Sequence, residues 1–281
     1  KLNERQRETR QQYDLAASLD LAKLLPEGAN VSIPMYYSVS ESVIRPQFNP
    51  LDPDIELQEL LSSNELTTEY KDSIRKITDD YTLRRSINFT NVRKLPGPNK
   101  TKQNFYDVEN FSFTYAYSEI FNRRINIKTD RLKTYRGAIN YNFTGKEKSV
   151  EPFKKVQFFQ ANKAFQLIQD INFNFVPSQV SIQNSFDRTY HERQARNITS
   201  GIGGGFVFES PPFHQKSFNW SRMYSLRHRF TKSLTFNFSA NNRSLINEPQ
   251  GQINPDDDTF FGEFNNEIWN NISRFGDNTN Y

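Results

Sequence analysis

Three histidines are the side chains in this sequence best suited to metal binding or to general acid–base chemistry. His191 opens the pentapeptide HERQA, which begins like a zinc-binding His-Glu-x-x-His helix, but Ala195 stands where the second histidine is needed. His214 and His228 have no carboxylate or cysteine at ligand spacing. We therefore expect no metal site.

The remaining motifs that could carry chemistry are also incomplete. The run Gly201–Gly205 lacks the Lys-Ser/Thr pair of a phosphate-binding loop, so we interpret it as a flexible loop or a strand bend. The acidic run of Asp256, Asp257 and Asp258 lacks the spacing and terminal glutamate of an EF-hand and is interpreted as a solvated loop. No Gly-x-Ser-x-Gly motif occurs. The sequence predicts no catalytic residue and no cofactor, and nothing in it argues for an enzyme.

The composition points to strands with one apolar and one polar face. The 281 residues include 25 Phe and 13 Tyr, yet hydrophobic residues make up only 35%. No apolar run approaches the roughly 20 residues of a transmembrane helix. There is no cysteine, which excludes disulfides and thiolate metal sites within this sequence. The 36 basic and 32 acidic residues are spread along the chain, so a nucleic-acid partner, although compatible with aromatics interleaved with arginine, is not the favoured interpretation.

The clearest element is a predicted antiparallel hairpin over Phe213–Ile246. Two runs of about a dozen residues alternate large apolar side chains with Ser, Thr, Asn and Arg, and the polar pair Thr231-Lys232 separates them. Strands of soluble proteins usually have about 5–6 residues, whereas membrane-spanning strands need about 9–11. An aromatic face also suits lipid, and a polar face suits a wet interior. We therefore predict an all-β fold, an antiparallel segment of a transmembrane β-barrel.

A second run, Phe111–Phe121, has the same alternation. The residues predicted to face lipid in the two runs are Phe111, Phe113, Tyr115, Tyr117, Phe218, Trp220, Tyr224, Leu234, Phe236 and Phe238. Those predicted to face the lumen are Ser112, Thr114, Asn219, Ser221, Arg227, Thr235 and Asn237. A further run through Tyr135 and Phe143 carries Arg131 and Lys133 on its apolar side, which would be costly in mid-membrane. Either that strand extends beyond the bilayer, or a turn lies near Thr129–Lys133.

Further strands are predicted around Tyr13–Leu21, Val31–Val39, Tyr81–Thr90, Ile171–Phe175 and Val180–Tyr190, with Pro34 at a bulge or an edge. The phrases LLPEGANVSI, FVPSQVSI and RFTKSLTF predict equivalent short turns on one rim, opposite long loops. Between the strands, residues 45–80 are predicted as a proline-rich extended loop followed by amphipathic helices over about Ile55–Asp79. Residues 145–163 are predicted as a charged linker, and residues 252–281 as a loop or short helical insertion.

The first residues, KLNERQRETRQQ, contain no apolar core of a signal peptide, so we expect residues 1–281 to be a partial barrel domain of a larger protein. Three alternatives remain: a small self-contained porin or transporter, a lipopolysaccharide-inserting barrel, and a soluble aromatic-rich β-domain that binds nucleic acid or glycan.

Several phrases resemble one family. They span Ile33–Leu57, Asp80–Lys94, Asn104–Ile127, Tyr135–Phe143 and Ser217–Gly251. Together they are similar, in order, to the barrel region of the SprA/Sov family, the outer-membrane translocon of the type 9 secretion system that also supports gliding motility.

The resemblance implies one arc of a very large single-chain barrel in the bacterial outer membrane, embedded in the lipid bilayer and exporting folded cargo proteins. It implies as partners the remainder of the barrel chain, a PorV-like small barrel, a periplasmic plug protein and the secreted cargo. It implies no catalytic residue.

Overall fold

The computed structural model describes residues 7–98, 100–146, 149–151, 172–199, 206–252 and 258–273. Most of the predicted linker 145–163 lies outside these ranges, as do the glycine run 201–205 and the aspartates 256 and 257.

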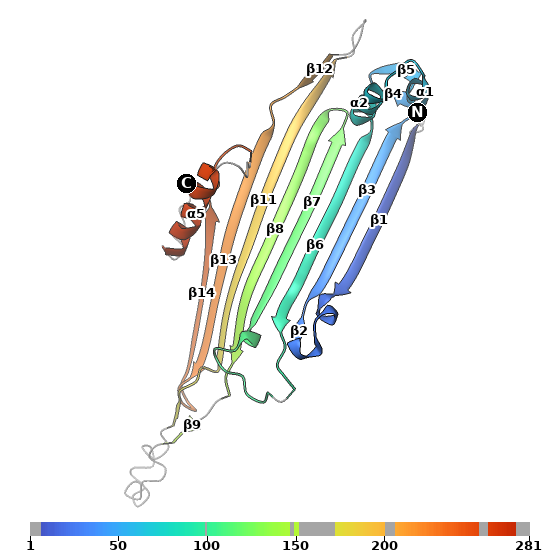
Figure 1. Cartoon of the computed structure of the whole chain (residues 1–281). Coiled ribbons are helices and arrows are strands. Elements are labelled where there is room, and N and C mark those ends of the chain that lie inside the picture. Colours follow the sequence, from blue (N-terminus) through green and yellow to red (C-terminus); the bar gives the residue numbers. More distant parts are fainter. Residues whose placement is uncertain are drawn as a thin grey trace, which may run out of the picture.

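Eight long antiparallel strands form one open, twisted sheet in which each long strand pairs with the next along the chain (Figure 1). The strands have 12 to 21 residues, so the longest spans about 70 Å at about 3.3 Å per residue. The expectation of an all-β, antiparallel fold is confirmed. The long strands are β1 Glu8–Asp20, β3 Pro34–Pro46, β6 Asp80–Lys94, β7 Phe111–Arg124, β8 Ile127–Thr144, β11 Gln179–Thr199, β13 Phe213–Arg229 and β14 Thr235–Ile246.

The sheet does not close on itself. β1 pairs only with β3, and β14 pairs only with β13, among the strands that the structure describes. Each edge strand therefore presents one row of backbone N–H and C=O groups to which no described strand is hydrogen-bonded.

Short strands extend or flank the sheet. β2 (Val31–Ser32) pairs with β6, and β12 (Phe206–Glu209) pairs with β11. Pro34 is the first residue of β3, separated from β2 by Ile33, a position where its missing N–H is tolerated. The pairing with β6 shifts by one residue between the pair of Ser32 with Arg93 and the pair of Met35 with Phe89, so the ladder is irregular beside Pro34, as predicted. β9 (Ser149–Val150) and β10 (Phe173–Asn174) form a two-residue ladder. The strand predicted through Ile171, Phe173 and Phe175 is therefore limited to Phe173–Asn174 among the described residues.

The proline-rich stretch after Arg45 is more regular than expected. β4 (Phe48–Asn49) and β5 (Asp52–Glu56) pair as a small hairpin, although its prolines were expected to exclude regular structure. Pro50 falls in the turn between the two strands, and the ladder shifts register between Phe48 and Asn49.

The predicted amphipathic helices are confirmed as α1 (Leu57–Ser62) and α2 (Thr68–Thr78). Thr67 caps α2, since its side chain accepts a hydrogen bond from the Tyr70 backbone N–H. The buried side chains Leu57, Leu61 and Ile74 hold the two helices together.

The tail contains α5 (Asp258–Ser273), which agrees with the predicted helical insertion. Three short 3-10 turns complete the described secondary structure: η1 Leu21–Leu24, η2 Glu27–Ala29 and η3 Val108–Asn110. No helix among the described residues combines the length and the apolar character needed to span a bilayer.

The three similar turn phrases lie at the same end of the sheet, as predicted, but the expected asymmetry of the two rims is wrong (Figure 1). The tightest connection, between Arg124 and Ile127, is at the other end, beside α1 and α2. The end with the short turns also carries the long loop between β6 and β7.

Candidate functional site

The strand registers divide the predicted surface residues cleanly between the two faces of the sheet. Residues directly opposite on neighbouring strands share a face. Phe111 lies opposite Tyr141, Tyr141 opposite Ile182, and Ile182 opposite Tyr224, which joins β7 to β13 on one face. We call it the aromatic face and the other the polar face.

With one exception, the predicted lipid-facing residues all lie on the aromatic face: Phe111, Phe113, Tyr115, Tyr117, Phe218, Trp220, Tyr224, Phe236 and Phe238. The exception is Leu234, which lies in the turn before β14, where the Thr231 hydroxyl accepts a hydrogen bond from its N–H. The predicted lumen-facing residues all lie on the polar face: Ser112, Thr114, Asn219, Ser221, Arg227, Thr235 and Asn237. Which face meets lipid stays a prediction.

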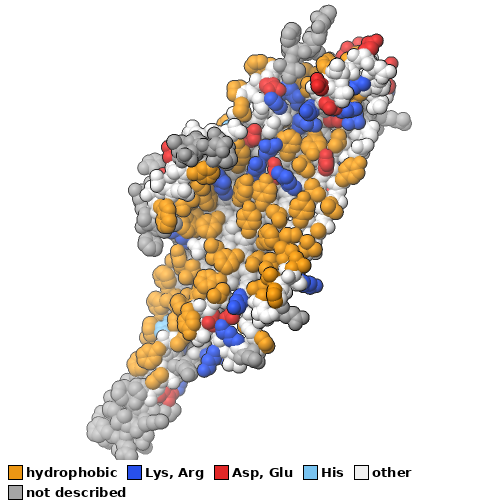
Figure 2. Space-filling model, in the orientation of Figure 1, with side chains coloured by type: hydrophobic (Ala, Val, Ile, Leu, Met, Phe, Trp, Pro, Cys, Tyr) orange, Lys and Arg blue, Asp and Glu red, His pale blue; other side chains and the backbone are white. Residues whose placement is uncertain are grey.

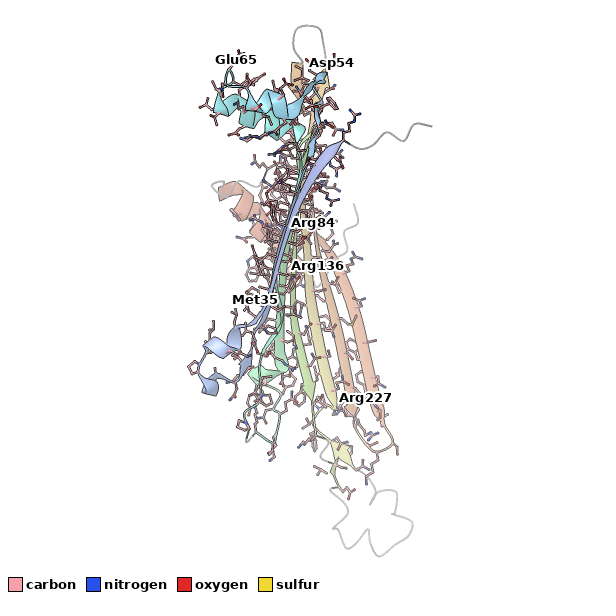
Figure 3. The ribbon with its side chains drawn as sticks, turned by 90° about the vertical axis from the view of Figure 1, so that its right-hand side faces the viewer. Met35, Asp54, Glu65, Arg84, Arg136 and Arg227 are labelled. Carbon is pink, nitrogen blue, oxygen red and sulfur yellow. The ribbon has the colours of Figure 1, made fainter. Side chains whose placement is uncertain are left out.

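The aromatic face carries a broad apolar band across the middle of the sheet (Figure 2). Its side chains remain open: Phe113 and Tyr115 are both 46% exposed, and Phe238 is 49% exposed. Met35, on this face, and Arg84, Arg136 and Arg227, on the polar face, extend from opposite sides of the sheet in the edge view (Figure 3). So much exposed aromatic surface exceeds what a soluble monomer usually presents.

A row of polar side chains bounds the band toward the end that carries α2. In register order across β6, β7 and β8 it consists of Arg85, Glu119 and Lys133. Glu119 is buried and accepts hydrogen bonds from Arg85 Nε at 2.6 Å and from the Tyr117 hydroxyl at 2.8 Å. Its other oxygen lies 3.4 Å from Arg131 Nε.

The sequence left two alternatives for Arg131 and Lys133, a strand that extends past the apolar region or a turn near them, and the continuity of β8 excludes the turn. β8 runs without interruption over Ile127–Thr144, so no turn lies near residues 129–133, and the strand extends past the apolar band. Arg131 lies over the Phe121 ring, 5.1 Å from its centroid, and within 3.9 Å of Glu192. Both charges therefore lie at or beyond the edge of the band, where Arg131 has its partners and Lys133 lies opposite Glu119.

Two arginines inside the band were not recognised from the sequence. Arg188 forms a two-pronged ion pair with Glu248, with N–O distances of 2.7 and 2.6 Å, and the ring of Phe264 from α5 covers it at 5.3 Å. Arg222 is 4% exposed and stacks on Trp220, with 3.6 Å between guanidinium carbon and ring centroid. Counting every second residue from Phe218 would have placed Arg222 here. The pairing with Glu248, 60 residues away from Arg188, has no signal in the sequence.

The polar face is held together by hydrogen bonds between short side chains. Ser38 and Ser86 hydroxyls lie 2.8 Å apart, and the Ser181 hydroxyl donates to the Asn142 side chain at 2.7 Å. Thr114, a predicted lumen residue, accepts from the N–H of Asn91, which adopts a left-handed φ of 56° at a bulge in β6. This face offers hydroxyl and amide groups and little apolar surface.

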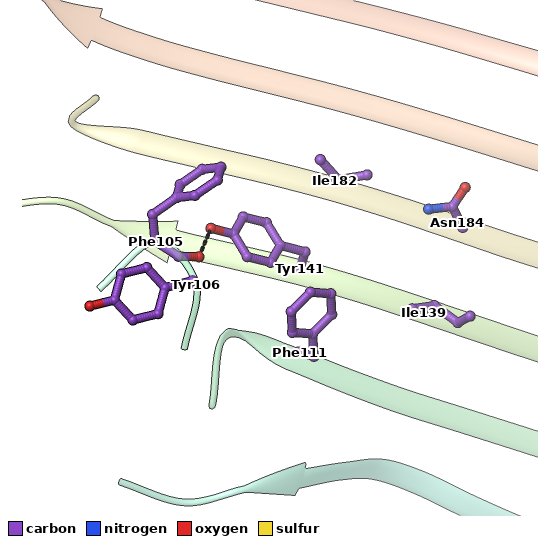
Figure 4. A pocket seen from close by; sticks show the side chains of 7 residues that line it. All are labelled: Phe105, Tyr106, Phe111, Ile139, Tyr141, Ile182 and Asn184. Atoms are coloured by element: carbon purple, nitrogen blue, oxygen red, sulfur yellow. Dashed lines mark hydrogen bonds between the residues drawn. The ribbon is translucent and has the colours of Figure 1, made fainter. Parts of the chain in front are cut away.

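An open pocket of about 400 Å³ lies where the loop before η3 folds over the lower part of the aromatic face (Figure 4). The Tyr141 hydroxyl donates to the backbone oxygen of Phe105 at 2.6 Å, and both Phe105 and Phe111 pack edge-on against its ring. The pocket is apolar, with Asn184 as its polar margin.

The same loop is closed by an ion pair outside the strands. Lys100 Nζ lies 2.8 Å from the Asp107 carboxylate and also contacts Glu109. The hydrogen bond from Lys100, followed by that from the Asn104 backbone, lowers the pKa of Asp107 below its usual value. The ion pair therefore stabilises the loop that forms the pocket wall at neutral pH.

The histidines stay apart. His191 Nε2 lies 2.7 Å from Asp130, His214 Nδ1 lies 2.9 Å from the Tyr190 hydroxyl, and His228 packs edge-on against Phe230. HERQA belongs to strand β11, so it cannot form a zinc-binding helix. Among the described residues, no three His, Asp or Glu side chains come together as metal ligands.

Comparison with known families gives a match at the N-terminus. Residues 1–61 match the family SprA_N, described as a motility related/secretion protein. The N-terminal segment is therefore similar to the SprA family. The match supports membership of the SprA/Sov family and covers β1, β3 and the β4–β5 hairpin, together with most of α1. It indicates a protein related to motility or secretion. No curated protein matches the chain.

Proposed function

We propose that this chain forms part of the wall of an outer-membrane translocon that exports folded cargo proteins in a type 9 secretion system. The observation that carries the proposal is the open sheet of eight long strands, aromatic on one face and hydroxyl- and amide-rich on the other. The match of residues 1–61 to a family related to motility or secretion supports it.

The geometry favours a barrel larger than this segment. Eight strands that closed on themselves would enclose a lumen only wide enough for side chains, because barrel diameter grows with strand number. β1 and β14 remain open at the two edges of the described sheet, so they can accept further strands on both sides. A small self-contained porin would need β1 and β14 to pair with each other, and they do not.

The polar face suits the passage of folded proteins. A folded protein presents mostly polar side chains with scattered apolar ones, and a wall of Ser, Thr and Asn gives it no continuous apolar surface to adhere to. The aromatic face would contact the lipid bilayer, with the row around Glu119 at the boundary of the hydrocarbon. We interpret the chain as having no enzymatic activity and no nucleic-acid partner.

The proposed partners follow from the family resemblance: the remainder of the barrel chain, a PorV-like small barrel, a periplasmic plug protein and the cargo.

Fractionation of the source cell is the first test. An antibody against residues 55–79, which include the exposed surface of α1 and α2, should detect a band in the outer membrane far heavier than this 33.0 kDa segment. A band near that mass in the same fraction would indicate a small porin. A band confined to the soluble fraction would refute the membrane barrel.

Cysteine labelling then tests which face meets lipid. The segment has no cysteine, so a single cysteine can be introduced at Phe113 or at its neighbour Thr114, which lie on opposite faces. With the protein in lipid, a polar maleimide should react with the cysteine at 114 and a lipid-soluble quencher should reach a probe at 113. The reverse pattern would invert the assignment of the two faces.

A further inference from the structure

A basic groove lies outside the apolar band, between α2 and the end of the β7–β8 hairpin. It has a volume of about 350 Å³. Four basic side chains line it, Lys76 from α2, Arg123 from β7, Lys128 from β8 and Arg196 from β11, with Glu209 from β12 as the acidic member. The five charges sum to +3. Basic side chains gather over this end of the aromatic face in Figure 2.

Most of this charge is not neutralised by the part of the chain that the structure describes. Lys128 pairs with Glu209 at 2.5 Å. Arg123 and Arg196 have no ion pair with a described carboxylate, and the Nε atoms of both are buried without a hydrogen-bond partner. Burying a guanidinium next to another cation costs several kcal/mol unless an anion compensates it.

The two arginines are nevertheless held in place. Arg196, only 6% exposed, donates from Nη2 to the backbone oxygen of Arg124 at 3.0 Å, which fixes it beneath the β7–β8 turn. Arg123 lies over the Tyr81 ring at 5.3 Å from its centroid. The groove is therefore pre-organised, with fixed cations and unused donors.

We propose that this groove binds a phosphoryl group, and that its source is the headgroup of a membrane lipid. A phosphoryl group has several acceptor oxygens and up to two negative charges, which match several converging cations better than one carboxylate does. The hydroxyls of Ser73 and Thr129 line the same groove and can donate to further oxygens.

The position of the groove favours a lipid over free phosphate. Phe121 and Arg123, which both line the groove, lie two and four residues beyond Glu119 on β7. These separations are about 7 and 13 Å along the strand, or about 5 and 9 Å along the membrane normal at a tilt near 45°, so the groove overlaps the headgroup layer. Lipid headgroups occupy the layer of about 5–8 Å next to the hydrocarbon. The apolar side chains of Phe121 and Ile77 also line the groove and can contact the first methylenes of the lipid. The lipid source rests on the membrane placement proposed above, whereas phosphoryl binding does not.

The test compares the native protein, purified in a non-ionic detergent and washed free of lipid, with two double variants. K76Q/R123Q removes two groove cations and leaves Arg196, which supports the turn. R84Q/R227Q removes two exposed cations from the polar face and is the matched control. The probes are a short-chain phosphatidic acid, the corresponding diacylglycerol and inorganic phosphate, with binding measured by native mass spectrometry and calorimetry.

We expect phosphatidic acid to bind the wild type and the control alike, and K76Q/R123Q at least about tenfold more weakly. Diacylglycerol should bind weakly and equally to all three. If inorganic phosphate binds as tightly as phosphatidic acid, the proposal that the phosphoryl group comes from a lipid is wrong. Equal binding of phosphatidic acid to K76Q/R123Q and wild type, with both folded by thermal melting, would overturn the phosphoryl site. None of these outcomes bears on the fractionation experiment, so the two proposals fail separately.

Discussion

Neutralising Glu248 should release the C-terminal part of the described sheet, and E248Q is the variant that shows it. Glu248 is 1% exposed and Arg188 is 23% exposed, so the substitution leaves a largely buried guanidinium without its counter-charge. Breaking a buried pair typically costs about 3–5 kcal/mol, and the partial exposure of Arg188 reduces this to about 3 kcal/mol.

Asp187, which directly precedes Arg188 and lies on the polar face, offers a matched control. Asp187 lies 3.1 Å from Arg136, but these side chains are 49% and 70% exposed. Solvent screening limits the contribution of such a pair to less than about 1 kcal/mol, so D187N should change the stability of the folded protein very little.

Hydrogen exchange of the native protein in detergent measures the difference locally. At about 1.4 kcal/mol per tenfold change, E248Q should raise the exchange rates of amides in β14 and α5 by about a hundredfold. The double variant R188M/E248M removes both charges and should recover most of the protection, because well-packed apolar residues often replace a buried ion pair without loss.

Two results would refute this reasoning. Equal effects of D187N and E248Q would mean that burial does not set the strength of these pairs. A double variant as labile as E248Q would mean that the lost stability comes from packing and not from the uncompensated charge.

Three further outcomes are expected. L57A should cost the α1–α2 pair about 2–3 kcal/mol, because this side chain is 1% exposed, and should speed protease cleavage within residues 45–80, whereas Y70A, at a 55% exposed position, should not. G145A should lower the yield of folded protein on semi-native gels, since an added Cβ would lie 2.2 Å from a backbone oxygen, whereas G97A, with nothing within 4 Å, should leave it unchanged. The pKa of Asp107 is lowered from 3.8 in the folded protein, so its contribution is complete above that value and is lost as the pH falls through the folded pKa. Amide protection of its loop, corrected for intrinsic exchange, should therefore decline at low pH in the wild type, and D107N should show reduced protection with no such decline.

The faces of the strands could be predicted from the sequence because alternation is a local property. Successive side chains of a strand point to opposite sides, so the order of Phe, Tyr, Ser and Asn within Phe111–Arg124 already separates Phe113 from Thr114. The helices of residues 57–78 were predictable for a related reason, because apolar residues at helical spacing form one face of a helix that must pack against other apolar side chains. The prediction that Leu234 lies in the strand was wrong because its N–H donates to the Thr231 hydroxyl and closes a turn, which the alternating pattern does not predict.

Pairing between strands depends instead on contacts across long stretches of chain. Only the register shows that Arg85, Glu119 and Lys133 form one row, and that β8 passes through it without a turn. The partner of Arg188 and the meeting of α2 with the β7–β8 turn around the basic groove are likewise tertiary facts, since each joins segments about 50 or more residues apart. The sequence by itself determined two chemically distinct faces, because side-chain direction follows from backbone geometry; the tertiary structure decided which charges meet, because that depends on how distant strands align.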